Sequence, residues 1–327
     1  MSSAKKKGNN KTGSHQVPRH SRSAIVLGIV LHILVLLILF LIIGWNRGIK
    51  DFLKTLSYPT VRELDLSGIH SSHAVLISAK GGKVIGETES RQPVYPASLT
   101  KMMTAILAIE KLDSLDHEIT LDADMFTDLY ARDATRAGFE PGETVKARDL
   151  LYGALLPSGA ECCIALARDI AGSEEAFAEK MNDKALRIGM EHTHFCNTTG
   201  LDDPEHVSTV YDMAILLKYC IRNKTFREMI SSHWHSTPPT NIHPDGITFY
   251  STLFRNLSDP YVTGGHILGG KTGYTNDAGQ CLASFAEIAG REYILVTSGA
   301  PGDNGEAQHV EDALTIYDRL GTAALEG

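Results

Sequence analysis

Apolar residues follow two periods along this chain, and the period predicts where strands and helices lie. Residues 73–80 and 83–87 are strand-like segments on either side of a Gly-Gly pair, which predicts a β-hairpin. From Pro96 onward apolar residues recur at steps of three and four, which indicates a helix that begins there. The same spacing predicts further helices at 147–156, 160–171, 174–188 and 209–221.

The pattern returns to strands near the end of the chain. Residues 280–288 and 292–298 predict two strands joined at 289–291, and a last helix is expected at roughly 306–320. Strands at both ends of a helical middle indicate one α+β domain, with helices flanking an antiparallel sheet that the C-terminal hairpin completes.

A long apolar run precedes this domain. Residues 24–43 contain His32 as their only strongly polar side chain, and a helix of this length spans roughly 30 Å, the thickness of a hydrocarbon core. A cleaved signal peptide would have a shorter run ending in small residues, whereas this run ends near Trp45, which suits the membrane interface. We therefore predict a transmembrane signal anchor, in order: basic tail 1–23, anchor 24–44, stalk 45–69 and folded body 70–322.

The charge is divided between the tail and the rest of the chain. The formal net charge is −8, but residues 1–23 carry six basic and no acidic residues, so the remainder has a net charge of −14. An acidic body argues against a nucleic-acid-binding surface. A basic tail before an apolar helix is typical of a cytoplasmic end, so we expect a single-pass protein of the cell membrane with its body outside the cytoplasm.

Neither the cysteines nor the histidines form a recognisable metal or disulfide pattern. The five cysteines are scattered and contain no Cys-x-x-Cys pair, so we interpret them as small buried core residues: Cys162, Cys163, Cys196, Cys220 and Cys281. The closely spaced histidines lack the His-Glu-x-x-His pattern and are interpreted as solvated loop residues: His192, His194, His233, His235 and His243. No metal or other cofactor is expected.

Ser98 and Lys101 form the first candidate chemical pair. They lie three residues apart at the start of the helix after Pro96, so they share one helix face. The helix N-terminus supplies free backbone N–H groups and a positive dipole end, which favour an alkoxide and an oxyanion. Lys101 can act as a base only when its neutral form is favoured, and burial or a second cation has that effect.

Lys271 is the candidate for that second cation. The Lys271-Thr272-Gly273 sequence follows two Gly-Gly pairs and precedes the C-terminal hairpin, so it is expected on an edge strand. A lysine and a hydroxyl there suit a substrate carboxylate, and a glycine allows a ligand to approach the backbone closely. By itself this triplet is more often a solvated turn, just as Ser158 before a predicted helix is more often an N-cap serine.

Taken together and in order, these elements resemble a known family. The chain is similar to the serine D-Ala-D-Ala carboxypeptidases, the low-molecular-mass penicillin-binding proteins, which carry the elements S-x-x-K, S-x-N and K-T-G. The stretches that carry the resemblance are residues 95–104, 155–161, 197–202 with 206–209, and 270–279. The resemblance extends from about residue 70 to 320 and implies a β-lactamase/transpeptidase-like fold with a helical subdomain.

The resemblance also implies roles for single residues. Ser98 would attack the carbonyl of the terminal D-Ala-D-Ala bond of a peptidoglycan stem pentapeptide, and Lys101 would take its proton. The backbone N–H groups of Ser98 and Tyr274 would form the oxyanion hole. Ser158 would relay a proton to the leaving D-alanine. Its carboxylate would be held by Lys271 and Thr272, and Gly273 would let the substrate approach the backbone closely. The same serine is expected to react with β-lactam antibiotics.

The chain departs from the family pattern in three places. Ala160 stands where the second element usually ends in Asn, so the amide that contacts the substrate is missing; loss of such a contact commonly costs on the order of 2–4 kcal/mol in the transition state. Glu161 is adjacent but points about 100° away on a helix. The chain ends soon after the catalytic fold, where the family often continues with a β-domain, and the anchor is N-terminal.

Three other functions share features with this one. A β-lactamase needs a carboxylate base, usually within E-x-x-L-N, and no such stretch occurs. Because Ala160 replaces the usual Asn, the sequence is also compatible with a catalytically weak or inactive protein that binds cell-wall peptides. The sequence is compatible with a DD-endopeptidase that cuts peptidoglycan cross-links as well, because the width of the pocket decides between carboxypeptidase and endopeptidase activity.

Overall fold

The computed structural model describes residues 33–34, 61–257, 259–302 and 306–326. The chain divides into two compact units, Met1–Lys54 and Thr55–Gly327, and the second carries all the elements named below. The anchor predicted at 24–44 lies outside the described residues, apart from Ile33 and Leu34. Within the described part of the chain, no helix has both the length and the apolar character needed to cross a bilayer.

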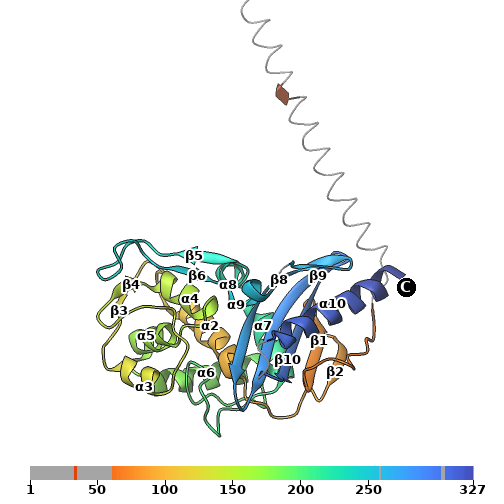
Figure 1. Ribbon diagram of the computed structural model, residues 1–327, viewed down its shortest axis with the longest axis horizontal. Helices are drawn as coiled ribbons and strands as arrows, with labels where there is room; N and C mark the ends of the chain where they lie inside the picture. Colours follow the sequence, from red (N-terminus) through yellow and green to blue (C-terminus); the bar gives the residue numbers. More distant parts are fainter. Residues whose placement is uncertain (1–32, 35–60, 258, 303–305, 327) are drawn as a thin grey trace, which may run out of the picture. The chain divides into compact units, whose positions relative to one another are not determined.

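A six-stranded antiparallel sheet forms one half of the second unit (Figure 1). Its spatial order is β2 (Val84–Thr88), β1 (His73–Ser78), β10 (Arg291–Ala300), β9 (Gly279–Ile288), β8 (Gly265–Thr275) and β7 (Tyr261–Val262). The N-terminal hairpin is therefore joined to the C-terminal strands through the β1–β10 pair, in which His73 lies opposite Ser298. This confirms the predicted hairpin, the C-terminal strand pair and the α+β class.

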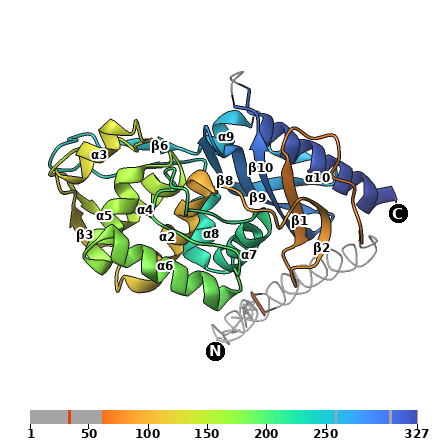
Figure 2. The ribbon, with the colours of Figure 1, turned by 90° about the horizontal axis from the view of Figure 1, so that it is seen from below.

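Alternating residues of the strands pack into two separate cores, one on each face of the sheet. On β1, Val75 and Ile77 join the core shared with the helical half, while Ala74 and Leu76 join the core under α10 (Gln308–Glu326). This is the two-residue period of a strand buried on both faces. Figures 1 and 2 show α10 along one face of the sheet and α7 (Val210–Cys220) on the opposite face.

The second half is helical (Figure 2), and the 3₁₀ turn Ala97–Thr100 before its first helix contacts β8 and β9 of the sheet. Its helices are α2 (Lys101–Lys111), α3 (Met125–Ala131), α4 (Ala147–Leu155), α5 (Ala160–Ala171), α6 (Glu174–Ile188) and α8 (Lys224–Ile230). The short helix α9 (Thr252–Asn256) instead contacts β8, and its Leu253 joins the core under α10. α2 is apolar on nearly all sides because it is packed among α4, α5, α6 and α7. The predicted helices at 147–156, 160–171, 174–188 and 209–221 are confirmed to within two residues.

Several short elements were not predicted from the sequence. They include α3, α8 and α9 and two small sheets, β3 (Glu118–Thr120) with β4 (Thr144–Lys146), and β5 (Trp234–Ser236) with β6 (Thr248–Tyr250). Three-residue strands and one- or two-turn helices are too short to show a clear period, and tertiary contacts hold them in place.

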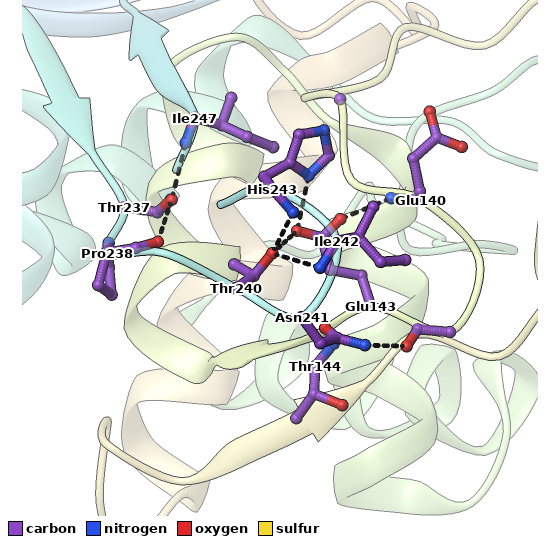
Figure 3. Close-up of polar contacts among 12 residues, drawn as sticks. Glu140, Glu143, Thr144, Thr237, Pro238, Thr240, Asn241, Ile242, His243 and Ile247 are labelled. Atoms are coloured by element: carbon purple, nitrogen blue, oxygen red, sulfur yellow. Dashed lines mark hydrogen bonds and ion pairs between the residues drawn. The ribbon is translucent and has the colours of Figure 1, made fainter. Parts of the chain in front are cut away.

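The loop between β5 and β6 is tied to the segment before β4 by a buried carboxylate (Figure 3). Oε1 of fully buried Glu143 lies 2.6 Å from the hydroxyl of Thr240 and 2.8 Å from Nδ1 of His243, and its Oε2 accepts the Glu140 N–H. His235 likewise lies 2.7 Å from Oδ1 of buried Asp149. The prediction of solvated loop histidines is therefore wrong for His235 and His243, because each pairs with a carboxylate that lies far away in the sequence.

Four of the five cysteines are buried and all five are free, which confirms their interpretation as core residues for Cys162, Cys163, Cys220 and Cys281. Cys196 is only half-buried. Residues 61–69 already belong to the packed body, since Leu66 is buried in the core under α10 and the Leu64 N–H donates to the Ile85 carbonyl.

Candidate active site

Ser98 and Lys101 lie side by side at the junction of the two halves. Ser98 belongs to the 3₁₀ turn Ala97–Thr100, and α2 begins at Lys101. The Lys101 ammonium nitrogen Nζ lies 2.7 Å from Ser98 Oγ and 2.7 Å from the carbonyl oxygen of Thr199. In a 3₁₀ turn residues i and i+3 eclipse each other, so this turn stacks the lysine against the serine more closely than an α-helix would.

A loop from a distant part of the chain supports this turn. Asn197 Oδ1 accepts the backbone N–H groups of Thr199 and Gly200, which shapes the loop. Gly200 has a φ of +81°, and a Cβ at this position would lie 1.8 Å from the Ala97 carbonyl oxygen. Only glycine allows this approach, which brings the Thr199 carbonyl within reach of Lys101.

Ser158 and Lys271 form a second hydroxyl–amine pair. Lys271 lies on β8, is fully buried, and donates from Nζ to Ser158 Oγ at 3.0 Å and to the Thr272 carbonyl at 2.7 Å. Ser158 has a φ of +72°, a conformation that costs a non-glycine residue on the order of 1 kcal/mol or more. The N-cap interpretation of Ser158 is wrong: Gly159 occupies the N-cap of α5, and the serine side chain is directed at Lys271.

The two pairs open into one cleft of about 400 Å³. Ser98, Ser158, Thr272, Gly273 and Tyr274 line it, so the residues predicted from three distant motifs meet at one place. A Cβ at Gly273 would lie 3.1 Å from the Ser98 nitrogen, which shows how closely β8 passes the serine. Tyr274 is half-exposed beside it.

Burial lowers the pKa of both lysines. Removal from water lowers the pKa of Lys101 and lowers that of Lys271 well below its ordinary value, because the interior disfavours an ammonium ion. The charge of Lys101 lowers the pKa of Lys271 further. The cleft thus disfavours two full positive charges, and a neutral amine beside Ser98 is the form that can take a proton.

Ala160 leaves the start of α5 without a polar side chain in the cleft. It is 1% exposed, and its N–H donates to the Thr135 carbonyl at 2.9 Å. The neighbouring Glu161 is turned away, since its Oε1 accepts the N–H groups of Ala137 and Gly138 at 2.6 and 3.0 Å. Burial raises the pKa of this carboxyl group. Glu161 therefore ties α5 to residues 134–138 and does not replace the missing amide.

The structure gives His206 a positioning role that the sequence did not. Its Nδ1 accepts the Cys196 N–H at 3.0 Å, so its proton sits on Nε2, which donates to the Thr100 hydroxyl at 2.8 Å. This links the loop that holds Thr199 to the turn that carries Ser98. His206 stood within one of the family-like stretches, but a contact across 106 residues has no signal in the sequence.

Because His206 is buried, its protonation should weaken the fold in mild acid. Burial lowers its pKa to about 4, below the ordinary value of 6.5. Between these values the unfolded chain binds more protons, so the free energy of unfolding falls as the pH drops from 6.5 to 4, by on the order of 3 kcal/mol in total. The measurement is the free energy of unfolding of the full chain in detergent, from urea denaturation at pH 7 and at pH 5. This free energy should fall less between the two pH values in His206→Ala than in the unchanged protein. An equal loss in both would assign the effect to other groups, such as His309.

Further lining residues of the cleft were not found from the sequence. Thr252 Oγ1 lies 2.6 Å from Thr272 Oγ1, and Asn256 follows on the same short helix. Thr135, Gln280 and His309 also line the cleft. Each comes from a segment without a motif, so only the folded chain brings them to the cleft.

Comparison with known proteins places this chain in a family. A model of the D-alanyl-D-alanine carboxypeptidases, peptidase family S11, matches residues 60–302. The chain is 32% identical to D-alanyl-D-alanine carboxypeptidase DacF of Bacillus subtilis, over 69% of this chain and 57% of that protein. It is 29% identical to a D-alanyl-D-alanine endopeptidase of Pseudomonas aeruginosa, over 77% of each.

Structure comparison agrees at the level of the fold. The DD-transpeptidase of Streptomyces K15 is similar with a TM-score of 0.70 at 24% identity, covering 78% of this chain and 98% of that one. The chain spans about three fifths of the length of several curated relatives, 57% for DacF and 62% for DacD of Escherichia coli. With the family model matching most of its residues, the chain belongs to the S11 family of D-alanyl-D-alanine carboxypeptidases.

Proposed function

We propose that this protein is a serine-type D-Ala-D-Ala carboxypeptidase that removes the terminal D-alanine from peptidoglycan stem pentapeptides. The observation that carries the proposal is the 2.7 Å contact between Lys101 Nζ and Ser98 Oγ, inside a cleft that also holds the Ser158–Lys271 pair. A buried amine with a lowered pKa at hydrogen-bond distance from a hydroxyl is the arrangement of an activated nucleophile.

Acylation follows from this arrangement. Ser98 Oγ attacks the carbonyl carbon of the D-Ala-D-Ala bond while its proton passes to neutral Lys101, and the tetrahedral intermediate carries an oxyanion. The backbone N–H groups of Ser98 and Tyr274 are proposed to bind that oxyanion. The C–N bond then breaks, the leaving nitrogen receives a proton through Ser158, and an ester forms on Ser98.

Deacylation returns the free enzyme. A water molecule attacks the ester carbonyl, the Ser98–acyl bond breaks, and Ser98 regains its proton, releasing the shortened peptide. Lys271 and Thr272 are the groups proposed to hold the carboxylate of the leaving D-alanine, because both lie on β8, where Lys271 contacts Ser158 and Thr272 lines the cleft. β-Lactams would acylate Ser98 by the same first step.

The membrane location belongs to the same proposal and is supported by the sequence. The basic tail 1–23 and the apolar run 24–43 favour a single-pass anchor with a cytoplasmic N-terminus. The body would then face the cell wall, where its substrate lies. Protease protection of the tail in intact cells, with the body accessible, is the expected result; a protected body would contradict the orientation.

The full chain in detergent is expected to release D-alanine from a pentapeptide ending in D-Ala-D-Ala and to be labelled by a fluorescent penicillin. Free D-alanine is measured with an oxidase-coupled assay, and the labelled band by gel fluorescence. A tetrapeptide ending in a single D-alanine serves as the control and should release none. A protein that binds the peptide without releasing D-alanine or taking up penicillin would be a binder of cell-wall peptides instead.

A further inference from the structure

Thr135 presents an unused hydroxyl group to the cleft. Its side chain is exposed and lines the same cleft as Ser98 and Ser158. Within the described part of the chain, its hydroxyl makes no hydrogen bond; the residue's contact with Ala160 goes through the backbone carbonyl. A hydroxyl in this position is available to a ligand.

The segment that carries Thr135 is held firmly. Glu161, fully buried, accepts the N–H groups of Ala137 and Gly138, and the Ala160 N–H binds the Thr135 carbonyl. Gly159 packs so closely that a Cβ there would lie 2.7 Å from the Ala137 side chain. These contacts fix the Thr135 backbone relative to Ser158 before any ligand arrives, which lowers the entropic cost of binding.

The opposite border of the cleft is an open strand edge. β7 pairs with β8 only at Gly265 and His266, while residues 271–275 of β8 pair with β9 on the other side. Within the described residues, the remaining edge of β8 at Lys271–Thr275 has no strand partner and passes Ser98. An extended peptide can add to such an edge through its backbone.

A peptide paired with β8 would have a second backbone edge in the same cleft, which Pro157 and Ser158, just before α5, also line. Ala160 offers no polar side chain there, and Glu161 is engaged elsewhere. Thr135 is adjacent to Ala160 and has a free hydroxyl. On the basis of the proposed function, we infer that the Thr135 hydroxyl hydrogen-bonds a backbone amide group of the bound stem peptide and so takes part in substrate recognition.

The test compares Thr135→Val, which keeps the shape and the backbone carbonyl but removes the hydroxyl, with Thr135→Ser, which keeps the hydroxyl. Loss of one neutral hydrogen bond should lower kcat/KM for the pentapeptide about 3- to 10-fold in Thr135→Val. Thr135→Ser should stay within about twofold of the unchanged protein. Thr127→Val, on the exposed side of α3, is the matched control and should have no effect. Thermal unfolding should be the same in all three variants.

A binding measurement separates this inference from the proposed hydrolysis. In the Ser98→Ala background, calorimetric titration with the same pentapeptide should show an affinity about 3- to 10-fold weaker when Thr135→Val is added. Equal affinities, or no binding of the pentapeptide, would overturn the role of Thr135 whether or not the unchanged chain releases D-alanine. Failure of D-alanine release with retained, Thr135-dependent binding would instead overturn the proposed function alone.

Discussion

Ser98→Ala should abolish both release of D-alanine and labelling by penicillin, while leaving the fold intact. The change removes the only atom of the Ser98–Lys101 pair that can form the ester, and loss of a nucleophile commonly costs a factor of about 10³ or more in rate. The side chain is half-buried, and Lys101 keeps its other hydrogen bond, to the Thr199 carbonyl, so the thermal midpoint should change little.

Mass spectrometry after penicillin exposure provides the measurement. The unchanged protein should gain the mass of one penicillin on the peptide that contains Ser98, and the variant should gain none. Ser208→Ala is a suitable comparison, because that buried hydroxyl lies outside the cleft, contacting Thr193. Labelling that persists in Ser98→Ala would identify another nucleophile and remove the basis of the mechanism.

Lys101→Arg should lose acylation at every pH, although arginine keeps a positive hydrogen-bond donor beside Ser98. The reason is that a guanidinium group does not deprotonate in proteins, whereas burial lowers the pKa of Lys101 and makes its neutral form accessible. In the unchanged protein the acylation rate should rise with pH as Lys101 loses its proton, with a midpoint below the ordinary lysine pKa of 10.5. A loss of about 10²-fold or more is expected in the variant, the usual contribution of a general base.

The pH dependence distinguishes a base from a merely structural lysine. Stopped-flow measurement of the second-order acylation rate across the pH range should show a rise in the unchanged protein and a flat, low profile in both Lys101→Arg and Lys101→Met. Lys184→Arg, at an ion pair with Glu110 on the surface side of the helices, should keep the normal profile. A variant at Lys101 that retained the normal rise would show that another group takes the proton of Ser98.

The main elements and the contact between Ser98 and Lys101 could be predicted because they depend on residues that are close together in the sequence. The spacing of three between Ser98 and Lys101 places the two side chains together in any helical turn, and the structure only changes the turn from α to 3₁₀. The hairpin around residues 81–82, the strands ending at Ile288 and Ala300 and the long helices have periods that can be counted along the chain. Local geometry alone accounts for these.

The rest of the cleft required the folded chain. Lys271 reaches Ser158 across 113 residues, and Thr100 meets His206 across 106, distances over which no spacing rule applies. The positive φ of Ser158, which turns its hydroxyl to Lys271 and makes the N-cap interpretation wrong, is a strained conformation that the surrounding contacts impose. His235 and His243 likewise pair with carboxylates on other elements.

The sequence by itself therefore determined the α+β class, the family-like motifs and the Ser98–Lys101 pair, because covalent spacing confines neighbouring side chains to a few positions. The resemblance also placed Ser158 and Lys271 in the same site. Tertiary structure alone decided the contact between these two residues, the places of His206 and Thr135 near the site, and the burial that lowers the pKa of both lysines. Burial and long-range contacts arise from how the sheet packs on the helices, and a one-dimensional pattern carries no measure of either.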